Sequence, residues 1–476
     1  MSSNPTGRED HTGGSSRPAA YPAPTATGPL DATVHVPGSK SWTNRWLALA
    51  ALASGPSTLH SPLDARDTRL MAGALRAFGH DVRIDAGSTG AAWRVTPAHR
   101  WHAPAEPIDC GLAGTVLRFL VPLASLAHGP VTFTGDERLG HRPLEPLLDA
   151  VRSLGLTVST GLHGHAGRTA DRADSTATGA GVLPLLMAGA LHPSDPDDAT
   201  VEVDASASSQ FVSALLLAGC TVHSGLTVRA TGTVPSRPHI DMTCHALQQV
   251  GVVAEQRDET SWWVEGKRPD PFEVTVEPDL SSAAVFAAAA AVAGGTVTLP
   301  GWPRSTTQAG DTIRDLLTRM GAHCELTDAG LRVTGGELHG IEADLSAAGE
   351  LTPVVAATAA LADSPSRLTG IGHLRGHETD RLAALATEIN ALGGEVRELP
   401  DGLEITPRPL HRGSFATYHD HRLAMAGALL GLRVPGIEVQ DIDTTAKTVP
   451  GFDRLWESML GMSAGQGSEP MLGGDA

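Results

Sequence analysis

Three short stretches of this chain combine basic side chains with serine, histidine or an acid. They are PGSKSWTNR at 37–45, HETDR at 377–381 and DHR at 420–422, and each opens or adjoins an apolar helical run. Lys and Arg bind phosphate and carboxylate groups, and a helix N-terminus adds the positive end of its dipole. Cations gathered from such distant parts of the chain therefore predict a pocket for a small substrate with several negative charges.

The overall charge limits the classes of molecule that the protein can bind. Lys and Arg together number 35 against 53 Asp and Glu, which gives a formal net charge of -18 at pH 7. A strongly acidic protein repels nucleic acid and anionic membranes unless it carries a large basic patch, and no run of basic residues here would make one. We therefore expect no nucleic acid and no membrane as partner, and a small anion as the target.

The length of 476 residues allows two large domains, each with its own core. No unbroken apolar stretch is long enough to span a membrane, and the four cysteines are scattered without the spacing of a zinc site. We therefore expect no metal, and a reducing cytoplasm, where isolated thiols persist. Residues 1–29, rich in Ser, Pro, Gly and Thr, and residues 461–476 are predicted to be disordered tails; the first lacks the apolar core of a signal peptide.

A structural unit recurs along the chain at intervals of roughly 70 residues, with one wider gap. Paired glycines mark it, as at Gly55 with Gly79 and at Gly295 with Gly321, while the last copy keeps only Gly436. In each copy an apolar helix is followed by a strand, then by a second helix that ends at a glycine, then by another strand. The pattern predicts an α/β protein made of six β-α-β-α-β-β units.

The first helix of each unit is apolar on nearly every face, so we expect it to be buried. Its polar residues gather in the first turn, where free N–H groups and the helix dipole make an anion site. Serine and aspartate there could be simple N-caps, but six such helices, several with Lys or Arg added, favour anion binding. These helices begin near Ser41, Gly114, Ser208, Ser281, Glu350 and His421.

Four further motifs occur in order along the chain. They are LAGTVLRF at 112–119, SSQF at 208–211, PSRPHID at 235–241 and TAKTVPGF at 445–452. With all seven motifs in view, the chain resembles the EPSP synthase family, the 3-phosphoshikimate 1-carboxyvinyltransferases, over residues 30–460. Seven matches in the same order make this resemblance much more specific than any one motif.

The resemblance implies a two-domain inside-out α/β barrel, with three of the units in each domain and the active site in the cleft between them. One domain then covers residues 39–276. The other combines residues 30–38 with residues 277–460, and the two crossovers form a hinge.

The implied reaction transfers the enolpyruvyl (1-carboxyvinyl) group of phosphoenolpyruvate to the 5-hydroxyl of 3-phosphoshikimate. Phosphate leaves through a tetrahedral intermediate, in a step of chorismate and aromatic amino-acid biosynthesis. The substrates are two small molecules. The resemblance also implies a monomer in the cytoplasm, no cofactor, and inhibition by glyphosate in competition with phosphoenolpyruvate.

By resemblance, the catalytic residues are Lys40, Glu350 and Glu378. Glu350 accepts the hydroxyl proton, and Lys40 stabilises charge on the oxygen that bridges to the departing phosphate. Glu378 is placed to protonate the methylene carbon, although the general acid stays open between Lys40 and Glu378. The matching phosphoenolpyruvate ligands are Lys40, Gly114, Arg142, Gln210, Arg381, Arg422 and Lys447. The matching 3-phosphoshikimate ligands are Lys40, Ser41, Arg45, Ser208, Ser209, Gln210, Ser236, Glu350 and His377.

Several positions depart from the family pattern. His377 stands where many relatives have Lys, His239 where many have Tyr, and Glu350 where many have Asp. Leu112 and Phe119 replace the Asn and Pro common beside the Gly-containing motif. We expect these changes to affect how the site holds charge and how its phosphoenolpyruvate wall is packed.

The nearest alternative is the sister enolpyruvyl transferase that acts on UDP-N-acetylglucosamine. That family has Lys-Asn where this chain has Lys40 and Ser41, and it usually carries Cys where this chain has Glu137, on the loop before Arg142. Both differences favour the shikimate enzyme.

Two alternatives lack this chemistry. A catalytically silent, anion-binding homologue would be expected to lose Lys40, Glu350 or Glu378, and all three are present. An RNA-binding protein, suggested by related repeats in RNA 3'-phosphate cyclases, conflicts with the net charge of -18.

Overall fold

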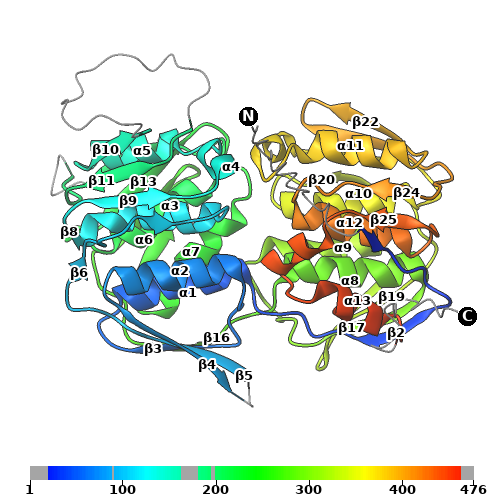
Figure 1. The fold of residues 1–476 in the computed structure, drawn as a ribbon, viewed down its shortest axis with the longest axis horizontal. Coiled ribbons are helices and arrows are strands. Elements are labelled where there is room, and N and C mark those ends of the chain that lie inside the picture. Colours follow the sequence, from blue (N-terminus) through cyan, green and yellow to red (C-terminus); the bar gives the residue numbers. More distant parts are fainter. Residues whose placement is uncertain (1–19, 88–89, 162–180, 194–198, 463–476) are drawn as a thin grey trace, which may run out of the picture.

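The structure, a computed structural model, describes residues 20–87, 90–161, 181–193 and 199–462. These residues form two hydrophobic cores, and each core lies at the centre of one domain (Figure 1). The first domain is built on side chains between Trp42 and Val276. The second domain joins the segment from Ala23 to Val34 with the segment from Leu280 to Met459.

Two crossings of the chain connect the domains. Ser39 N donates to Glu277 O at 2.8 Å, and Asp279 N donates to Pro37 O at 2.9 Å. The two connections are therefore hydrogen-bonded to each other. A movement of one domain against the other would turn about this stretch.

The complete units fold into sheets that all have the same strand order. In the third unit the strands are β12 (Thr200–Asp204), β13 (Leu226–Thr231), β14 (Ala254–Gln256) and β15 (Ser261–Val264), and their order is β12-β13-β15-β14. The first pair is parallel and the other pairs are antiparallel. The parallel pair requires a crossover connection, which a buried helix provides.

Five units have this four-stranded form within the described residues, and together with a three-stranded sixth they confirm the predicted repeat. In each domain the first of these sheets takes one strand from a distant segment near the crossings. In the same strand order, the other four sheets are β16-β3-β5-β4 (Glu273–Thr275, Ser57–His60, Gly90–Thr96, Asp81–Gly87), β7-β9-β11-β10 (Ile108–Asp109, Val131–Thr134, Leu185–Ala188, Thr157–Thr160), β2-β17-β19-β18 (Leu30–Thr33, Gly295–Leu299, Gly330–Thr334, His323–Thr327) and β20-β21-β23-β22 (Glu342–Asp344, Ser366–Thr369, Gly402–Thr406, Glu395–Leu399). A separate parallel pair is formed by β6 (Trp101–His102) and β8 (Ala127–His128).

The N-terminal segment corrects one prediction. Residues 20–29 were expected in a disordered tail, yet β1 (Tyr21–Pro22) pairs antiparallel with β25 (Ile437–Val439), which is itself parallel to β24 (Gly413–Phe415). The described part of the sixth unit has no strands after β25, so β25 would otherwise present an unpaired edge, and β1 covers it. Ala23 is buried beside Gly431.

The other predicted tail residues lie almost wholly outside the described part of the chain. Residues 1–19 and 463–476 are not among the described residues. At the C-terminal end, Gly461 N and Met462 N still donate to carbonyls of the last helix, at 3.0 Å each, so these two residues continue the second domain.

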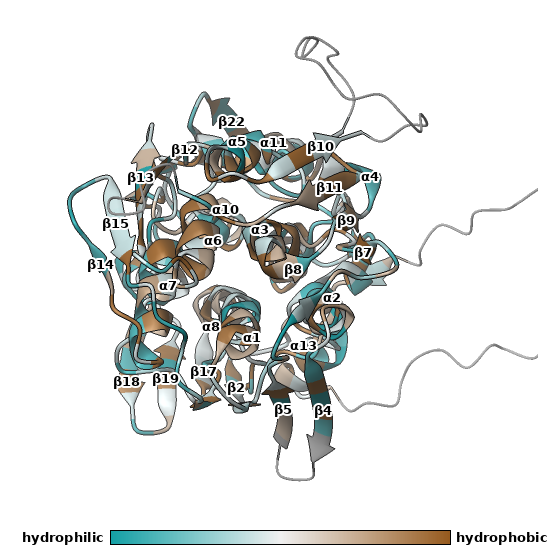
Figure 2. Cartoon of the chain, turned by 90° about the vertical axis from the view of Figure 1, so that its left-hand side faces the viewer, coloured by the Kyte–Doolittle hydropathy of each residue, from teal (hydrophilic) through white to brown (hydrophobic). Residues whose placement is uncertain are grey.

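The first helix of every unit is buried, as its apolar sequence predicts. In Figure 2 the inner helices of the first domain lie inside a ring of strands, which is the inside-out arrangement. Their neighbours are one another: α3 packs on α6, and α10 and α12 both pack on α8. The inner helices are α1 (Lys40–Leu52), α3 (Gly114–Leu123), α6 (Gln210–Gly219), α8 (Leu280–Ala293), α10 (Thr352–Ala360) and α12 (His421–Gly431).

The second helices are less completely buried, and each exposes one polar face. They are α2 (Arg66–Ala77), α5 (Glu145–Ser153), α7 (Pro238–Gln249), α9 (Ile313–Arg319), α11 (Arg381–Ala391) and α13 (Phe452–Met459). The remaining short helices are α4 (Glu137–Gly140), η1 (Ala124–Leu126), η2 (Ala309–Thr312), η3 (Gly349–Leu351), η4 (Gly372–Gly376) and η5 (Ile442–Lys447). Across the described residues, no helix combines the length and the apolar character needed to cross a membrane.

Candidate active site

A cleft between the two domains collects the starts of all six inner helices, as predicted. The first turn of each inner helix, or a residue within two positions before it, lines the cleft. These helices are buried in a low-dielectric core, so their N–H groups and dipoles make the cleft attractive to anions although the protein is acidic. The lining residues that the sequence analysis named are Lys40, Ser41, Gly114, Arg142, Ser208, Ser209, Gln210, Ser236, Glu350, His377, Glu378, Arg381, Arg422 and Lys447.

Arg45 is the exception among the predicted site residues. It is 0% exposed and is not among the residues that line the cleft, so its contact with 3-phosphoshikimate stays a prediction. Its Nη1 donates to Ser41 O at 3.0 Å and its Nη2 to His239 O at 2.7 Å. Burial lowers the pKa of Arg45 to about 9. Its Nε donates to Thr243 Oγ1 at 2.8 Å, so the guanidinium bonds both to a buried side chain and to the backbone of two residues that face the cleft.

Glu378 lies in a network of ion pairs on the second domain. Its carboxylate accepts from Lys447 Nζ at 2.7 Å and from Arg381 Nη2 at 3.1 Å. Burial would raise the pKa of Glu378, but Lys447, Arg142 and Arg381 outweigh it and hold that pKa well below its usual value. The carboxyl is therefore ionised at neutral pH.

Asp420 anchors Arg381 in this network. Arg381 is 1% exposed, and its Nε donates to Asp420 Oδ2 at 2.7 Å. Asp420 also caps α12, because its Oδ1 accepts from Arg422 N at 2.8 Å. Despite burial, the charges of Asp420 and Glu378 raise the pKa of Arg381. The sequence analysis quoted Asp420 in a motif without a role, and its position at a helix start was the available signal.

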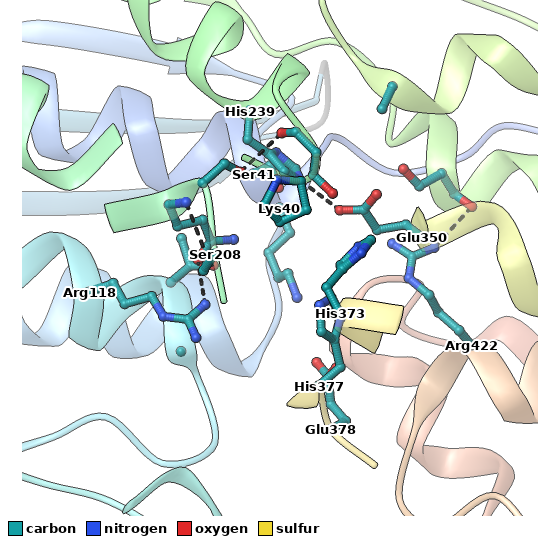
Figure 3. A pocket seen from close by; sticks show the side chains of 18 of the residues that line it. Lys40, Ser41, Arg118, Ser208, His239, Glu350, His373, His377, Glu378 and Arg422 are labelled. Atoms are coloured by element: carbon teal, nitrogen blue, oxygen red, sulfur yellow. Dashed lines mark hydrogen bonds and ion pairs between the residues drawn. The ribbon is translucent and has the colours of Figure 1, made fainter. Parts of the chain in front are cut away.

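Glu350 faces the cleft from η3, directly before α10. Its Oε1 lies 2.6 Å from His239 Nε2, while its Oε2 is buried with no hydrogen-bond partner among the described residues (Figure 3). Burial would raise the pKa of Glu350, but the charge and hydrogen bond of His239, helped by Arg422, hold it well below its usual value. An ionised carboxylate with one free oxygen can accept a proton from a bound hydroxyl group.

Lys40 begins α1 at the boundary between the domains. Its Nζ lies 3.6 Å from Asp67 Oδ2, and its backbone N donates to Asp279 Oδ2 of the second domain at 3.3 Å. Burial and then the charge of Lys447 lower the pKa of Lys40, against the opposing charges of Asp67 and Glu378. A lysine with a lowered pKa releases a proton more readily, which suits general acid chemistry.

The first domain supplies neutral donors and acceptors to the other side of the cleft. Gln210 Oε1 accepts from Arg118 Nη1 at 3.2 Å. Ser209 Oγ donates to Ser236 O at 3.0 Å, and Ser236 N donates to Ser346 O of the second domain at 2.9 Å. Ser236 has φ +50°, a left-handed conformation that is uncommon for a non-glycine residue and is found often at functional sites.

Arg142 and Gly114 face each other at one end of the cleft. A Cβ added at Gly114 would lie 3.0 Å from Arg142 Nη1, so the missing side chain allows the guanidinium to approach the helix start. Arg142 Nε is buried and has no hydrogen-bond partner in the described part of the chain. Burial, followed by the charge of Arg142, lowers the pKa of the adjacent Arg118 to about 9. Arg142 therefore has a donor available for an anion.

The EPSP synthase (3-phosphoshikimate 1-carboxyvinyltransferase) family model matches residues 24–168 and 178–456 of this sequence. The chain belongs to this family. A curated relative from Kocuria rhizophila, a 3-phosphoshikimate 1-carboxyvinyltransferase, is 51% identical over 449 residues, which are 93% of this chain and 96% of the relative.

Solved structures agree on the fold. An EPSP synthase from Acinetobacter baumannii superposes with a TM-score of 0.74 at 23% identity and covers 93% of this chain and 98% of its own. The enolpyruvyl transferase NikO from Streptomyces tendae superposes with a TM-score of 0.70 at 20% identity and covers 93% of this chain and 97% of its own. At these identities the likeness concerns the fold alone.

Two histidines, His373 and His377, line the cleft beside Arg381. His377 Nδ1 lies 3.3 Å from Arg381 Nη1, and burial and the Arg381 charge hold the pKa of His377 well below its usual value. The His373 ring lies 5.7 Å from the His377 ring, and its Nε2 is buried without a partner in the described residues. The sequence analysis missed His373, since no motif or periodicity distinguishes it from the other histidines.

Leu112 precedes α3 and Phe119 lies within it, and the two residues have different surroundings. Phe119 is fully buried, and Arg45 lies over its ring at 5.3 Å, so it supports the wall from behind. Leu112 borders a neighbouring cavity that also reaches His377 and Glu378. Within the described residues, no group of three or more His, Cys, Asp or Glu side chains is arranged to hold a metal ion.

Proposed function

We propose that this chain transfers the enolpyruvyl group of phosphoenolpyruvate to the 5-hydroxyl of 3-phosphoshikimate at the interdomain cleft, with release of phosphate. The observation that carries the proposal is the meeting of six helix N-termini with two buried, ionised carboxylates and several cations in one cleft. Membership of the EPSP synthase family supports the same reaction.

Phosphoenolpyruvate would bind among the cations at the Arg142 end of the cleft. Arg142 has unused donors, and its planar fork suits a carboxylate or phosphate. Lys40 and Gln210 reach the same space from helix starts, and the bare backbone at Gly114 leaves room for the ligand. The second domain completes this set with Arg381, Arg422 and Lys447.

3-Phosphoshikimate would bind along the serines of the first domain. Hydroxyl groups suit a substrate that carries several hydroxyls and one phosphate. Arg45 would act through Ser41 rather than by direct contact, because its guanidinium bonds to Ser41 O. The proposed ligands are Lys40, Ser41, Ser208, Ser209, Gln210, Ser236, Glu350 and His377.

Two carboxylates and one lysine would carry the proton steps. Glu350 would take the 5-hydroxyl proton on its free Oε2 as the hydroxyl oxygen bonds to C2 of phosphoenolpyruvate. Lys40 would be the better general acid for the methylene carbon, because its pKa is lowered toward neutrality while that of Glu378 is held well below its usual value. Anions that engage Lys447 and Arg381 would raise the pKa of Glu378 and prepare it for its own proton transfer.

We also propose that the protein works as a monomer in the cytoplasm, without a cofactor and without a nucleic-acid or membrane partner. One chain supplies both faces of the cleft, so the site needs no second copy. The net charge of -18 argues against nucleic-acid and membrane partners, and the four free cysteines support the cytoplasm.

A phosphate-release assay with purified protein tests the reaction. Phosphoenolpyruvate is supplied with either 3-phosphoshikimate or UDP-N-acetylglucosamine, and we expect release with 3-phosphoshikimate alone. Release with the nucleotide sugar would identify the sister transferase instead. Release with neither acceptor would indicate an anion-binding protein without the chemistry.

A further inference from the structure

His239 reaches across the cleft to Glu350. Its Nε2 lies 2.6 Å from Glu350 Oε1, and the two side chains are 13% and 16% exposed. His239 belongs to α7 of the first domain and Glu350 to η3 of the second, so the contact joins the domains (Figure 3). From the described residues, no other side chain donates a hydrogen bond to this carboxylate.

The backbone of His239 is fixed from behind. Its carbonyl oxygen accepts from Arg45 Nη2 at 2.7 Å, from Thr243 Oγ1 at 3.0 Å and from Ser213 Oγ at 3.1 Å. Arg45, Thr243 and Ser213 are each 0% exposed. Three buried donors on one carbonyl leave this turn of α7 little freedom, so the imidazole is aimed at the second domain before any ligand arrives.

We propose that His239 is the positioning residue of the catalytic base: by bonding to Oε1 of Glu350, it directs Oε2 toward the substrate hydroxyl when the domains are closed. The inference rests on the proposed function, in which Glu350 takes the 5-hydroxyl proton. That proton moves to Oε2 while the hydroxyl oxygen bonds to C2 of phosphoenolpyruvate and the methylene carbon gains a proton from the general acid. The imidazole contributes no atom to the products.

The effect of His239 on the pKa of Glu350 can be tested separately from the effects of the other residues of the site. Burial raises the pKa of Glu350, and the charge and hydrogen bond of His239 oppose that rise more strongly than any other neighbour. Removing His239 should therefore let the pKa of Glu350 rise while the other neighbours stay in place. The other charged or titratable groups near this carboxylate are Arg422, His373, His377 and Arg381.

The test is the pH profile of kcat with both substrates saturating. His239→Gln keeps a hydrogen-bond donor without the charge, and His239→Ala removes both. We expect the acid limb to lie at the lowest pH in the natural protein, at higher pH in His239→Gln and highest in His239→Ala. The shift should reach about one pH unit, a tenfold change in proton affinity. His245→Gln is the matched control, because His245 is exposed on the same helix and does not line the cleft.

Variant profiles that superimpose on that of the natural protein would overturn the role of His239. A second measurement needs no turnover: the melting temperature as a function of pH, with saturating 3-phosphoshikimate. Because the pKa of folded Glu350 is depressed, its stabilisation is present above the unfolded value of about 4.3 and is lost as the pH falls below it. The difference in melting temperature between the natural protein and His239→Ala should therefore narrow on acidification.

A melting difference that stays constant with pH would also overturn the role of His239. Failure of the proposed function gives a different result from failure of the role of His239. If the proposed function is wrong, the natural protein itself releases no phosphate at any pH, before any variant is compared.

Discussion

The two faces of the cleft differ in how their charged side chains are paired. On the second domain, Arg381 is bound to Asp420 at 2.7 Å and Lys447 to Glu378 at 2.7 Å, so these cations are paired before a ligand arrives. On the first domain, Arg142 has no ion pair with any described residue, and Lys40 meets Asp67 only at 3.6 Å. One face is an internally neutralised network, while the other holds cations with unused hydrogen-bonding capacity.

This difference separates binding from proton transfer. An anion gains most from a cation that has no competing acid, so the first domain should contribute mainly to affinity. The paired face holds its carboxylates in fixed positions and fixed charge states, so the second domain should contribute mainly to turnover. Variants on the two faces should then split between KM and kcat.

The largest expected effect is on the second domain. Glu350→Gln removes the base but keeps an oxygen that can accept from His239. It should lower kcat by about 100- to 10,000-fold, with much smaller changes in the two KM values. Steady-state phosphate release measures both constants, and Glu342→Gln, an exposed position on the same domain, is the control. Near-normal turnover would remove Glu350 from the mechanism.

Arg142→Gln tests the opposite face. Hydrogen bonds to charged groups contribute about 1.5–3 kcal/mol each, so loss of the fork should raise KM for phosphoenolpyruvate about 10- to 100-fold. The effect on kcat and on 3-phosphoshikimate binding should be smaller. Arg152→Gln is the control, because Arg152 pairs with Glu145 and Asp149 and does not line the cleft. A loss confined to kcat would contradict the division between the faces.

Gly114→Ala sharpens the comparison at the wall of the first domain. The new methyl would lie 3.0 Å from Arg142 Nη1 and displace that guanidinium, with strain of about 1–3 kcal/mol. Glyphosate is longer than phosphoenolpyruvate and has less room to adjust, so its inhibition constant should rise more than KM for phosphoenolpyruvate. Competitive inhibition measured in both proteins decides this. Equal increases in the two constants would show that the methyl does not face the ligand.

The smallest effect concerns the charge of His377. Burial and Arg381 hold its pKa well below the usual value, against Glu378, so its imidazole is neutral near pH 7. Protonation should strengthen binding of the phosphorylated ligand only as the pH falls through that lowered pKa, and affinity should be flat across the neutral range. His377→Lys should bind about 2- to 5-fold more tightly at pH 7. Calorimetric titration of 3-phosphoshikimate at several pH values measures this affinity in both proteins. Equal affinities of the natural protein and His377→Lys at every pH would make His377 merely structural.

The sequence was sufficient for features that depend on neighbouring residues. Apolar helices with polar first turns, glycines that end helices, and the order of the motifs predicted the repeat and the buried helices, and nearly all of the predicted site residues line the cleft. Helix periodicity and capping act over three or four residues, so a single chain displays them directly.

Only the tertiary structure decided the partners of these residues. Arg45 bonds to the backbone instead of lining the cleft, β1 covers the open edge of β25, and His239 meets Glu350 across 111 residues of sequence. Each of these contacts depends on how separate units pack or how the two domains dock. A buried polar group takes whichever partner the packed structure brings within hydrogen-bond distance, and no local pattern in the chain records that choice.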